Sequence, residues 1–139
     1  MPLSMKTINP FPSFSMLLPD NVAENNENST VASYWRKGDT CLLQVSSFKR
    51  DSGSQVSAAQ RVSERIEMGG TWEPFRLPQE IHGCEAAAAC TVDDQGTTWV
   101  HAYLVWPWLT VHATISRKGN LSACEWAWEA LSSIQPVVM

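Results

Sequence analysis

The chain has 139 residues, of which 44% are hydrophobic and 17% charged, a composition typical of one globular domain rather than a disordered segment. Ten Lys and Arg against fourteen Asp and Glu give a formal net charge of -4, which disfavours binding to the phosphate backbone of nucleic acids. No apolar run is long enough to span a bilayer, and prolines interrupt the stretch where a signal-peptide core would lie. We therefore predict a cytoplasmic protein that binds neither nucleic acid nor membranes.

The N-terminal region shows little pattern before the first predicted strand. Residues 1–12 are expected to form a flexible arm, and residues 13–139 a single α/β domain. The segment Phe14–Leu18 is predicted to be a strand that ends at Pro19. Residues 21–30 are polar and rich in asparagine, so they are predicted to be an exposed loop.

Two strands and a helix are predicted next. The strands are Val31–Arg36 and Thr40–Phe48, which contain β-branched and aromatic residues. The helix is predicted over Gln55–Met68, with Ser54 as its N-cap and Gly69 after its end. Apolar residues recur at helical spacing, at Val56, Ala59, Val62 and Ile66. The polar side chains of this helix are most simply solvated: Arg61, Glu64, Arg65 and Glu67.

The C-terminal half is predicted to contain four strands and a second helix. The strands are Thr71–Leu77, at a sheet edge because of Pro74, then Glu85–Val92, Thr97–Trp106 and Leu109–Ser116. The helix begins near Ser122, where Ser122 and Glu125 form a capping-box pattern, and Pro136 ends it. The chain is therefore predicted to be an α+β protein, with a single antiparallel sheet and two main helices.

Alternation in the last hairpin predicts which side chains share a face. Leu109, Val111, Ala113 and Ile115 are apolar and alternate with polar residues, so they are expected to face the core. If Pro107-Trp108 is the loop, Val100, Ala102, Leu104 and Trp106 join them. The opposite face then carries Trp99, His101, Tyr103 and His112, with His112 opposite Tyr103 and diagonal to His101. A helix of the same protein covering that face is an equally good expectation.

The sequence shows no catalytic constellation, metal site or cofactor motif. His101 and His112 are two potential ligands, but zinc takes three or four, and the register adds only Cys90 as a candidate third. A nucleophilic pair of Cys90 with His101 lacks an orienting acid and a marked oxyanion hole. We therefore predict no catalytic residues, no bound metal and no cofactor. The four cysteines, Cys41, Cys84, Cys90 and Cys124, are predicted to be buried free thiols.

Seven tryptophans are many for a chain of 139 residues, and tryptophan is enriched at binding hot spots. Trp35, Trp106 and Trp128 are expected in the core. Trp126 and Trp128 lie about 200° apart around a helix axis, so Trp126 is expected to be exposed. With Trp108 at the hairpin tip and Trp99, Trp126 completes a set of predicted exposed anchors.

The order of predicted elements resembles the PsbP-like fold. The supporting residues are Phe14-Ser15-Met16-Leu17-Leu18-Pro19, the turn Asp94-Gln95-Gly96 and the spacing Trp128-x-x-Leu131-x-x-Ile134. The resemblance covers most of the chain after residue 12 and implies a PsbP-like α/β sandwich. It also implies binding of other proteins, because proteins that look like this include photosystem subunits and bacterial chaperones of type VI secretion effectors.

The leading hypothesis from the sequence is a non-catalytic protein-binding module. Its partner would be another protein, such as a secreted effector held by a chaperone or a toxin held by an immunity protein. The predicted partner-binding residues are Trp99, His101, Tyr103, Trp108, His112 and Trp126. The alternative is a small-molecule binder or enzyme that uses the face of His101, Tyr103 and His112. A third possibility is a homodimer that buries its tryptophans.

Overall fold

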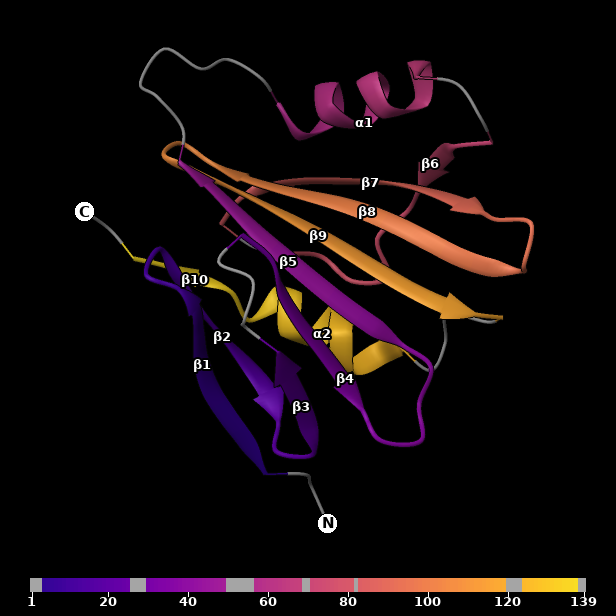
Figure 1. Ribbon diagram of the computed structural model, residues 1–139. Helices are drawn as coiled ribbons and strands as arrows, with labels where there is room; N and C mark the ends of the chain where they lie inside the picture. Colours follow the sequence, from indigo (N-terminus) through magenta and orange to yellow (C-terminus); the bar gives the residue numbers. More distant parts are fainter. Residues whose placement is uncertain are drawn as a thin grey trace.

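The computed structural model describes residues 4–25, 30–49, 57–68, 71–81, 83–119 and 124–137. Within these ranges the chain forms two helices, α1 (Ala58–Glu67) and α2 (Glu125–Ser132), together with ten strands (Figure 1). The strands are β1 (Met5–Phe11), β2 (Phe14–Pro19), β3 (Val22–Asn25), β4 (Ala32–Arg36), β5 (Leu42–Lys49), β6 (Glu73–Phe75), β7 (Glu85–Val92), β8 (Thr97–Trp106), β9 (Leu109–Lys118) and β10 (Gln135–Pro136). The predicted α+β class is confirmed. Neither described helix is long and apolar enough to cross a membrane.

The strands form two sheets, where we had predicted one. The larger sheet has seven strands in the order β3-β4-β5-β9-β8-β7-β6, and every neighbouring pair is antiparallel. The smaller sheet has three strands in the order β1-β2-β10, also antiparallel. The smaller sheet pairs β2, near the N-terminal end of the chain, with β10, near its C-terminal end. No local sequence pattern specifies such a long-range pairing.

The two helices lie on opposite faces of the seven-stranded sheet (Figure 1). The main core lies between this sheet, α2 and β2, and its largest fully buried side chains include Tyr34, Phe14, Met16, Leu18, Leu43, Leu104, Ile115 and Leu131. We call the core-facing side of this sheet its inner face and the α1 side its outer face. Burial of apolar area on the inner face is the main driving force for this arrangement.

The register of the last hairpin is confirmed. Trp106 pairs with Leu109, Leu104 with Val111, Ala102 with Ala113 and Tyr103 with His112. The side chains predicted to face the core are buried, since Val111 and Ile115 are both 0% exposed. Strict alternation in β9 leaves one facing that buries the apolar set, so the sequence specifies the register strongly.

The N-terminal segment is a strand rather than the flexible arm that we had predicted. β1 pairs with β2, from Met5 opposite Pro19 to Phe11 opposite Phe14, and residues 1–3 lie outside the described ranges. The predicted loop over residues 21–30 is also partly wrong, because β3 pairs with β4. Both segments are edge strands. The side chains of β1 are exposed or half-buried and three of the four in β3 are exposed, and neither sequence shows the alternation of apolar and polar residues that predicts a strand.

Both helices begin later than predicted. The N-cap of α1 is Ser57, whose hydroxyl accepts a hydrogen bond from the Gln60 amide at 3.1 Å; Ser54 lies outside the described residues. The N-cap of α2 is Cys124, which makes no capping hydrogen bond through its side chain. The predicted capping residue Ser122 lies outside the described residues.

Two of the four cysteines form a disulfide, which corrects the prediction of four free thiols. Cys41 is bonded to Cys124, with their Cα atoms 5.7 Å apart and a sequence separation of 83 residues. The bond joins the start of β5 to the start of α2 within the main core. Cys84 and Cys90 are free and half-buried. The two bonded cysteines lie far apart in the sequence, so spacing alone could not pair them.

The predictions for Trp126 and Trp35 are also wrong. Trp126 is 4% exposed and Trp128 is 3% exposed, although they lie on different sides of α2. Trp128 stacks on Phe75 of β6, and the Trp126 indole donates to Asp39 in the β4–β5 turn at 3.3 Å. The prediction assumed one buried helix face, whereas α2 is covered from both sides. Trp35 is 37% exposed instead of buried, because its neighbour Tyr34 faces the core.

Candidate functional site

The outer face of the seven-stranded sheet brings Tyr103, His112 and His101 together. The Tyr103 and His112 rings stack with their centroids 4.7 Å apart, and the two imidazole rings stack at 5.0 Å. His101 Nδ1 and His112 Nε2 share a hydrogen bond of 2.9 Å, which fixes the two imidazoles against each other. The indole of Trp72 meets His101 edge-on, with centroids 4.9 Å apart. Four rings therefore form a continuous aromatic row.

Helix α1 covers part of this face, which confirms the expectation that a helix of the same protein could do so. Its buried residues Ala58 and Val62 form a small cluster with Ala89, Tyr103 and Val105. In the ladder of β7 and β8, Ala89 lies opposite His101 and Ala87 opposite Tyr103. Since alanine has only a methyl side chain, these positions let α1 approach the sheet closely beside the large rings.

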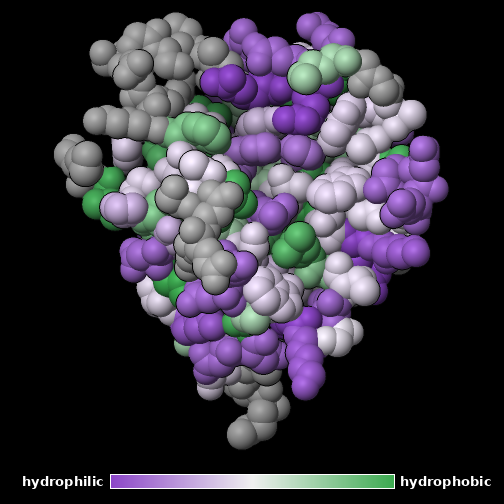
Figure 2. Space-filling model, in the orientation of Figure 1, coloured by the Kyte–Doolittle hydropathy of each residue, from purple (hydrophilic) through white to green (hydrophobic). Residues whose placement is uncertain are grey.

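The start of α1 is fixed to the sheet by hydrogen bonds. The Ala58 amide donates to Glu85 of β7 at 2.6 Å, and Ser57 caps the Gln60 amide. These side-chain oxygens satisfy amide groups that have no partner within the helix. The outer surface of α1, at the top of Figure 2, is largely hydrophilic, in keeping with its exposed Gln60, Ser63 and Glu67.

Arg65 links α1 to the aromatic row. Its Nε donates to the Tyr103 hydroxyl at 2.8 Å, and its guanidinium lies over the Trp72 ring at 5.2 Å from the centroid. The Tyr103 side chain is only 8% exposed, so this hydrogen bond satisfies a nearly buried hydroxyl.

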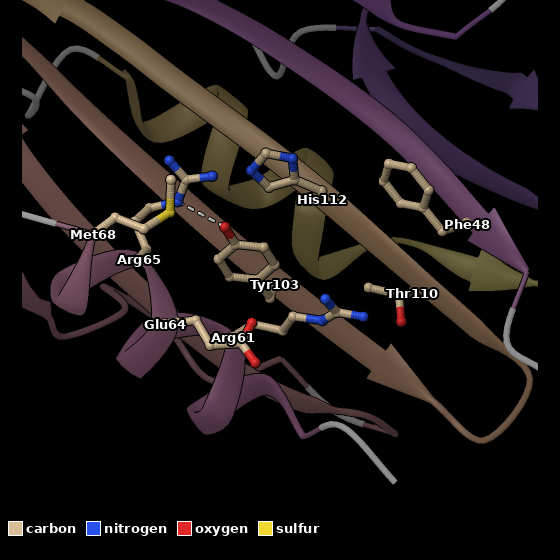
Figure 3. Close-up of a pocket in the computed structure, with 8 residues that line it drawn as sticks. All are labelled: Phe48, Arg61, Glu64, Arg65, Met68, Tyr103, Thr110 and His112. Carbon is tan, nitrogen blue, oxygen red and sulfur yellow. Dashed lines mark hydrogen bonds between the residues drawn. The ribbon is translucent and has the colours of Figure 1, made fainter. Parts of the chain in front are cut away.

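A cleft of about 340 Å³ lies between α1 and the outer face of the sheet (Figure 3). Its lining comes from α1, from the residue that caps α1 and from three neighbouring strands. The residues are Arg61, Glu64, Arg65 and Met68 on the helix side, Tyr103 on β8, Thr110 and His112 on β9 and Phe48 on β5. Figure 3 shows Arg61 extending from α1 toward Thr110, and Arg65 lying between Met68 and Tyr103.

The imidazoles beside the cleft are held in their neutral form. Burial lowers the pKa of His101 and of His112 to about 4, and the positive charge of Arg65 acts in the same direction. At neutral pH these rings therefore add hydrogen-bonding capacity to the cleft but no charge. The fixed charges that line it come from Arg61, Arg65 and Glu64.

The structure does not bring the six predicted site residues together in one place. Tyr103 and His112 line the cleft, and His101 lies behind His112 in the aromatic row. Trp99 is half-buried further along β8, where its indole donates to Asp93 at 3.0 Å. Trp108 is 37% exposed in the β8–β9 turn, as predicted, whereas Trp126 is buried in the core and is not a surface anchor.

Five cleft residues were missed by the sequence reasoning or read as ordinary surface: Arg61, Glu64, Arg65, Met68 and Phe48. The helical spacing of Arg61 and Arg65 places both on one side of α1, but the sequence does not say which strands that side crosses. Cys90 pairs with Val100 and packs against the main core, so it does not join the histidines. Among the described residues, no group of three or more His, Cys, Asp or Glu is placed to hold a metal ion.

Comparison with known proteins supports the fold. No family model matches the chain, and no curated protein matches it. A similar solved structure is the crystal structure, at 1.50 Å resolution, of a protein from Bacteroides thetaiotaomicron VPI-5482, with a TM-score of 0.65 and 14% sequence identity. The match covers 90% of this chain and 45% of that chain, so this chain spans less than half the length of that protein. At this identity the likeness shows the fold alone.

Proposed function

We propose that the protein binds a small molecule in the cleft between α1 and the outer face of the seven-stranded sheet. The observation that carries this proposal is a cavity of about 340 Å³ whose floor is made by Tyr103 and His112 and whose rim carries exposed apolar side chains. Small-molecule sites are typically concave, within roughly 300–1,000 Å³, and combine apolar walls with a few converging polar groups.

The rim supports a ligand site because it carries two large apolar side chains that are exposed. Phe48 is 54% exposed and Met68 is 79% exposed, and both line the cleft. They come from β5 and from the end of α1, on different sides of the cleft (Figure 3). A bound molecule would cover apolar surface that otherwise contacts water.

The chemistry of the floor favours binding over catalysis. A general base needs a pKa near the working pH and a free nitrogen directed at the substrate. In this cleft the pKa of His112 is about 4, and its Nε2 is already hydrogen-bonded to His101. The Tyr103 hydroxyl is likewise engaged by Arg65. The Tyr103 hydroxyl accepts from Arg65 and keeps its own proton, so it can still donate one hydrogen bond to a ligand.

The proposal is tested by screening a fragment library that contains neutral, anionic and cationic compounds, with ligand-observed NMR as the readout. The variant Arg61→Trp places a large ring at the cleft, and Ser63→Trp places the same ring on an exposed position of the same helix. We expect fragments that bind the wild-type protein and Ser63→Trp but not Arg61→Trp. If all fragment binding is absent, or is equal in the two variants, the cleft is not a ligand site.

A protein-binding module is a second candidate function, and one observation favours it. Trp108 is 37% exposed at the tip of the β8–β9 hairpin, where a partner could cover it. The partner would be another protein, including the effector or toxin that the PsbP-like resemblance implies, or a second copy of this chain. Co-purification from the native host tests it, with Trp108→Ser expected to lose the partner and Trp35→Ser to keep it. Sedimentation of the purified chain separates the second-copy case.

We also propose that the protein resides outside a reducing cytoplasm, and the observation that supports this location is the disulfide. We had predicted the cytoplasm, but disulfides persist mainly in oxidising compartments. The Cys41–Cys124 bond therefore supports a location outside a reducing cytoplasm. Trapping of free thiols in freshly lysed host cells tests this: two blocked thiols in four are expected, and four blocked thiols would restore the cytoplasmic prediction.

A further inference from the structure

The charge of the cleft is opposite in sign to the net charge of the whole chain. The chain carries a formal net charge of -4, whereas the cleft is lined by two arginines and one glutamate. The local excess is one positive charge, since the histidines are neutral at pH 7. A ligand with one negative charge would complement this excess, and a second negative charge would meet no further cation among the lining residues.

Arg65 is held in one orientation at the cleft. Its Nε is used by the Tyr103 hydroxyl at 2.8 Å, and its flat face lies over Trp72. The terminal nitrogens of the guanidinium make no hydrogen bond with the described residues, and Figure 3 shows them on the side of His112. A guanidinium fixed by stacking and by Nε keeps its planar pair of donors for a carboxylate.

Arg61 supplies the second positive charge. It lies one helical turn before Arg65 and extends toward Thr110 on the opposite wall of the cleft (Figure 3). Within the part of the chain that the structure describes, its guanidinium has no hydrogen-bond or ion-pair partner, although Glu64 is near in sequence. An unpartnered guanidinium at a cavity wall is available to an anionic ligand.

The geometry points to a ligand that carries one carboxylate on an apolar body, such as an aryl or alkyl monocarboxylate. This inference rests on the proposed function, because it names the ligand class of the same cleft. The carboxylate is placed at the guanidinium of Arg65, on the His112 side of Tyr103, and Arg61 adds positive charge from the Thr110 side of the cleft (Figure 3). The apolar body lies against Phe48 and Met68, the two apolar residues at the rim.

The ligand class is tested with three probes that have the same carbon skeleton: 3-phenylpropanoate, 3-phenylpropan-1-ol and 3-phenylpropan-1-amine. Probes this small bind weakly, so NMR titration of the protein amides is the suitable measurement. We expect all saturable shifts to map to the cleft, and the carboxylate to bind about tenfold more tightly than the alcohol, as one charge-assisted pair provides. The amine should bind more weakly than the alcohol.

Charge variants assign the carboxylate to its partners. Arg61→Ala and Arg65→Gln should each weaken binding of 3-phenylpropanoate about tenfold more than they weaken binding of the alcohol. Glu64→Gln should strengthen carboxylate binding, because it removes the one negative charge of the lining. Lys37→Ala, in the β4–β5 turn and outside the cleft, removes the same charge from the chain and should change neither affinity.

The outcomes separate this inference from the proposed function. Equal affinity for the carboxylate and the alcohol, or tighter binding of the amine, would leave a ligand site in the cleft but overturn the carboxylate class. Loss of alcohol and carboxylate binding together in Arg61→Ala would show that Arg61 acts on the shape of the cleft and not on charge. If neither these probes nor the mixed-charge library shifts any cleft amide, the proposed function fails with the inference.

Discussion

At the residue scale, the central feature is a pair of imidazoles that are partners of each other. The 2.9 Å hydrogen bond between His101 and His112 requires one ring nitrogen to donate and the other to accept. A proton added to the accepting nitrogen would break this bond and place a positive charge near Arg65. The same contacts that orient His112 toward the cleft therefore oppose its protonation.

The resistance of both imidazoles to protonation predicts how the stability of the folded protein depends on pH. Imidazoles of the unfolded chain take up protons near pH 6.5, whereas those of the folded protein stay neutral until about pH 4. Between these values the unfolded state binds more protons, so the free energy of unfolding falls as the pH falls from about 6.5 to about 4. The slope is at most about 1.4 kcal/mol per pH unit for each proton taken up.

Urea unfolding between pH 7 and pH 5 measures this slope. The double variant His101→Gln/His112→Gln should flatten it, and Thr114→Ala on the same strand face should keep it. Burial raises the pKa of Asp39, but hydrogen bonds from the Cys41 amide and the Trp126 indole outweigh it and lower this pKa below its ordinary value. This carboxyl therefore titrates below the range of pH 7 to pH 5 in which the slope is measured. An unchanged slope in the double variant would show that the histidines are not protected from protonation.

Among the elements, α2 is held against the seven-stranded sheet by contacts with two separate parts of that sheet, β6 and the β4–β5 turn. Trp128 stacks on Phe75 of β6, and Trp126 donates to Asp39 while Arg36 lies 5.8 Å from the centre of its ring. The carboxylate of Asp39 also accepts from the Cys41 amide at 3.0 Å. One side chain thus connects the turn before β5 to the helix.

Removal of this carboxylate should loosen the attachment of α2. We predict that Asp39→Ala lowers the free energy of unfolding by about 1–3 kcal/mol, because the indole and amide donors lose their acceptor. Urea unfolding followed by tryptophan fluorescence measures the change. Asp94→Ala, at an exposed position of the β7–β8 turn, should change stability little. Equal effects of the two variants would contradict the anchoring role of Asp39.

Helix α1 is attached differently, through a small cluster apart from the main core. Its buried residues are Ala58 and Val62, whereas β8 and β9 bury long apolar rows on the inner face. Local opening is easier where few apolar contacts must be broken. The wall of the cleft that α1 provides is therefore its more mobile side.

Hydrogen exchange tests the attachment of α1. Amides of residues 58–67 should exchange about tenfold or more faster than those of β8 and β9. Val62→Ala should accelerate exchange in α1 further and leave β9 unchanged, whereas Ser63→Ala on the exposed side should have no effect. Equal protection of α1 and β9 in the wild-type protein would mean that the helix opens only with the whole domain.

At the scale of the whole molecule, the Cys41–Cys124 disulfide connects segments that are 83 residues apart. A cross-link over a loop of this length removes much conformational freedom from the unfolded chain, and disulfides of this kind stabilise by about 2–4 kcal/mol. Both cysteines are buried, so the bond lies within the core that joins the larger sheet to α2.

Reduction should therefore destabilise the protein by about 2–4 kcal/mol and lower its Tm. The measurement is urea and thermal unfolding with and without dithiothreitol. Cys84→Ala/Cys90→Ala keeps the disulfide and should respond to the reductant as the wild type does, whereas Cys41→Ala/Cys124→Ala should not respond. A response of the wild type no larger than that of this second variant would show that the disulfide adds no stability.

The α+β class, most strands and the facing of the last hairpin could be predicted from local sequence patterns. The hairpin was predictable because period-two alternation in β9 allows one register that buries Val111 and Ile115, and that register carries Tyr103 and His112 to the other side. Both ends of β7 and of β8 were predicted to the residue, because turn residues flank strongly β-forming segments.

What covers each face of these elements depends on contacts between residues that are distant in the sequence. The cleft depends on which strands α1 crosses, the burial of Trp126 depends on its contacts with Asp39 and Arg36 at the β4–β5 turn, and the disulfide depends on the meeting of distant segments. Edge strands β1 and β3 were missed because their sequences show no alternation of apolar and polar residues. Local patterns report which side of an element is apolar, and long-range packing selects its partner, since hydrophobic burial is not directional.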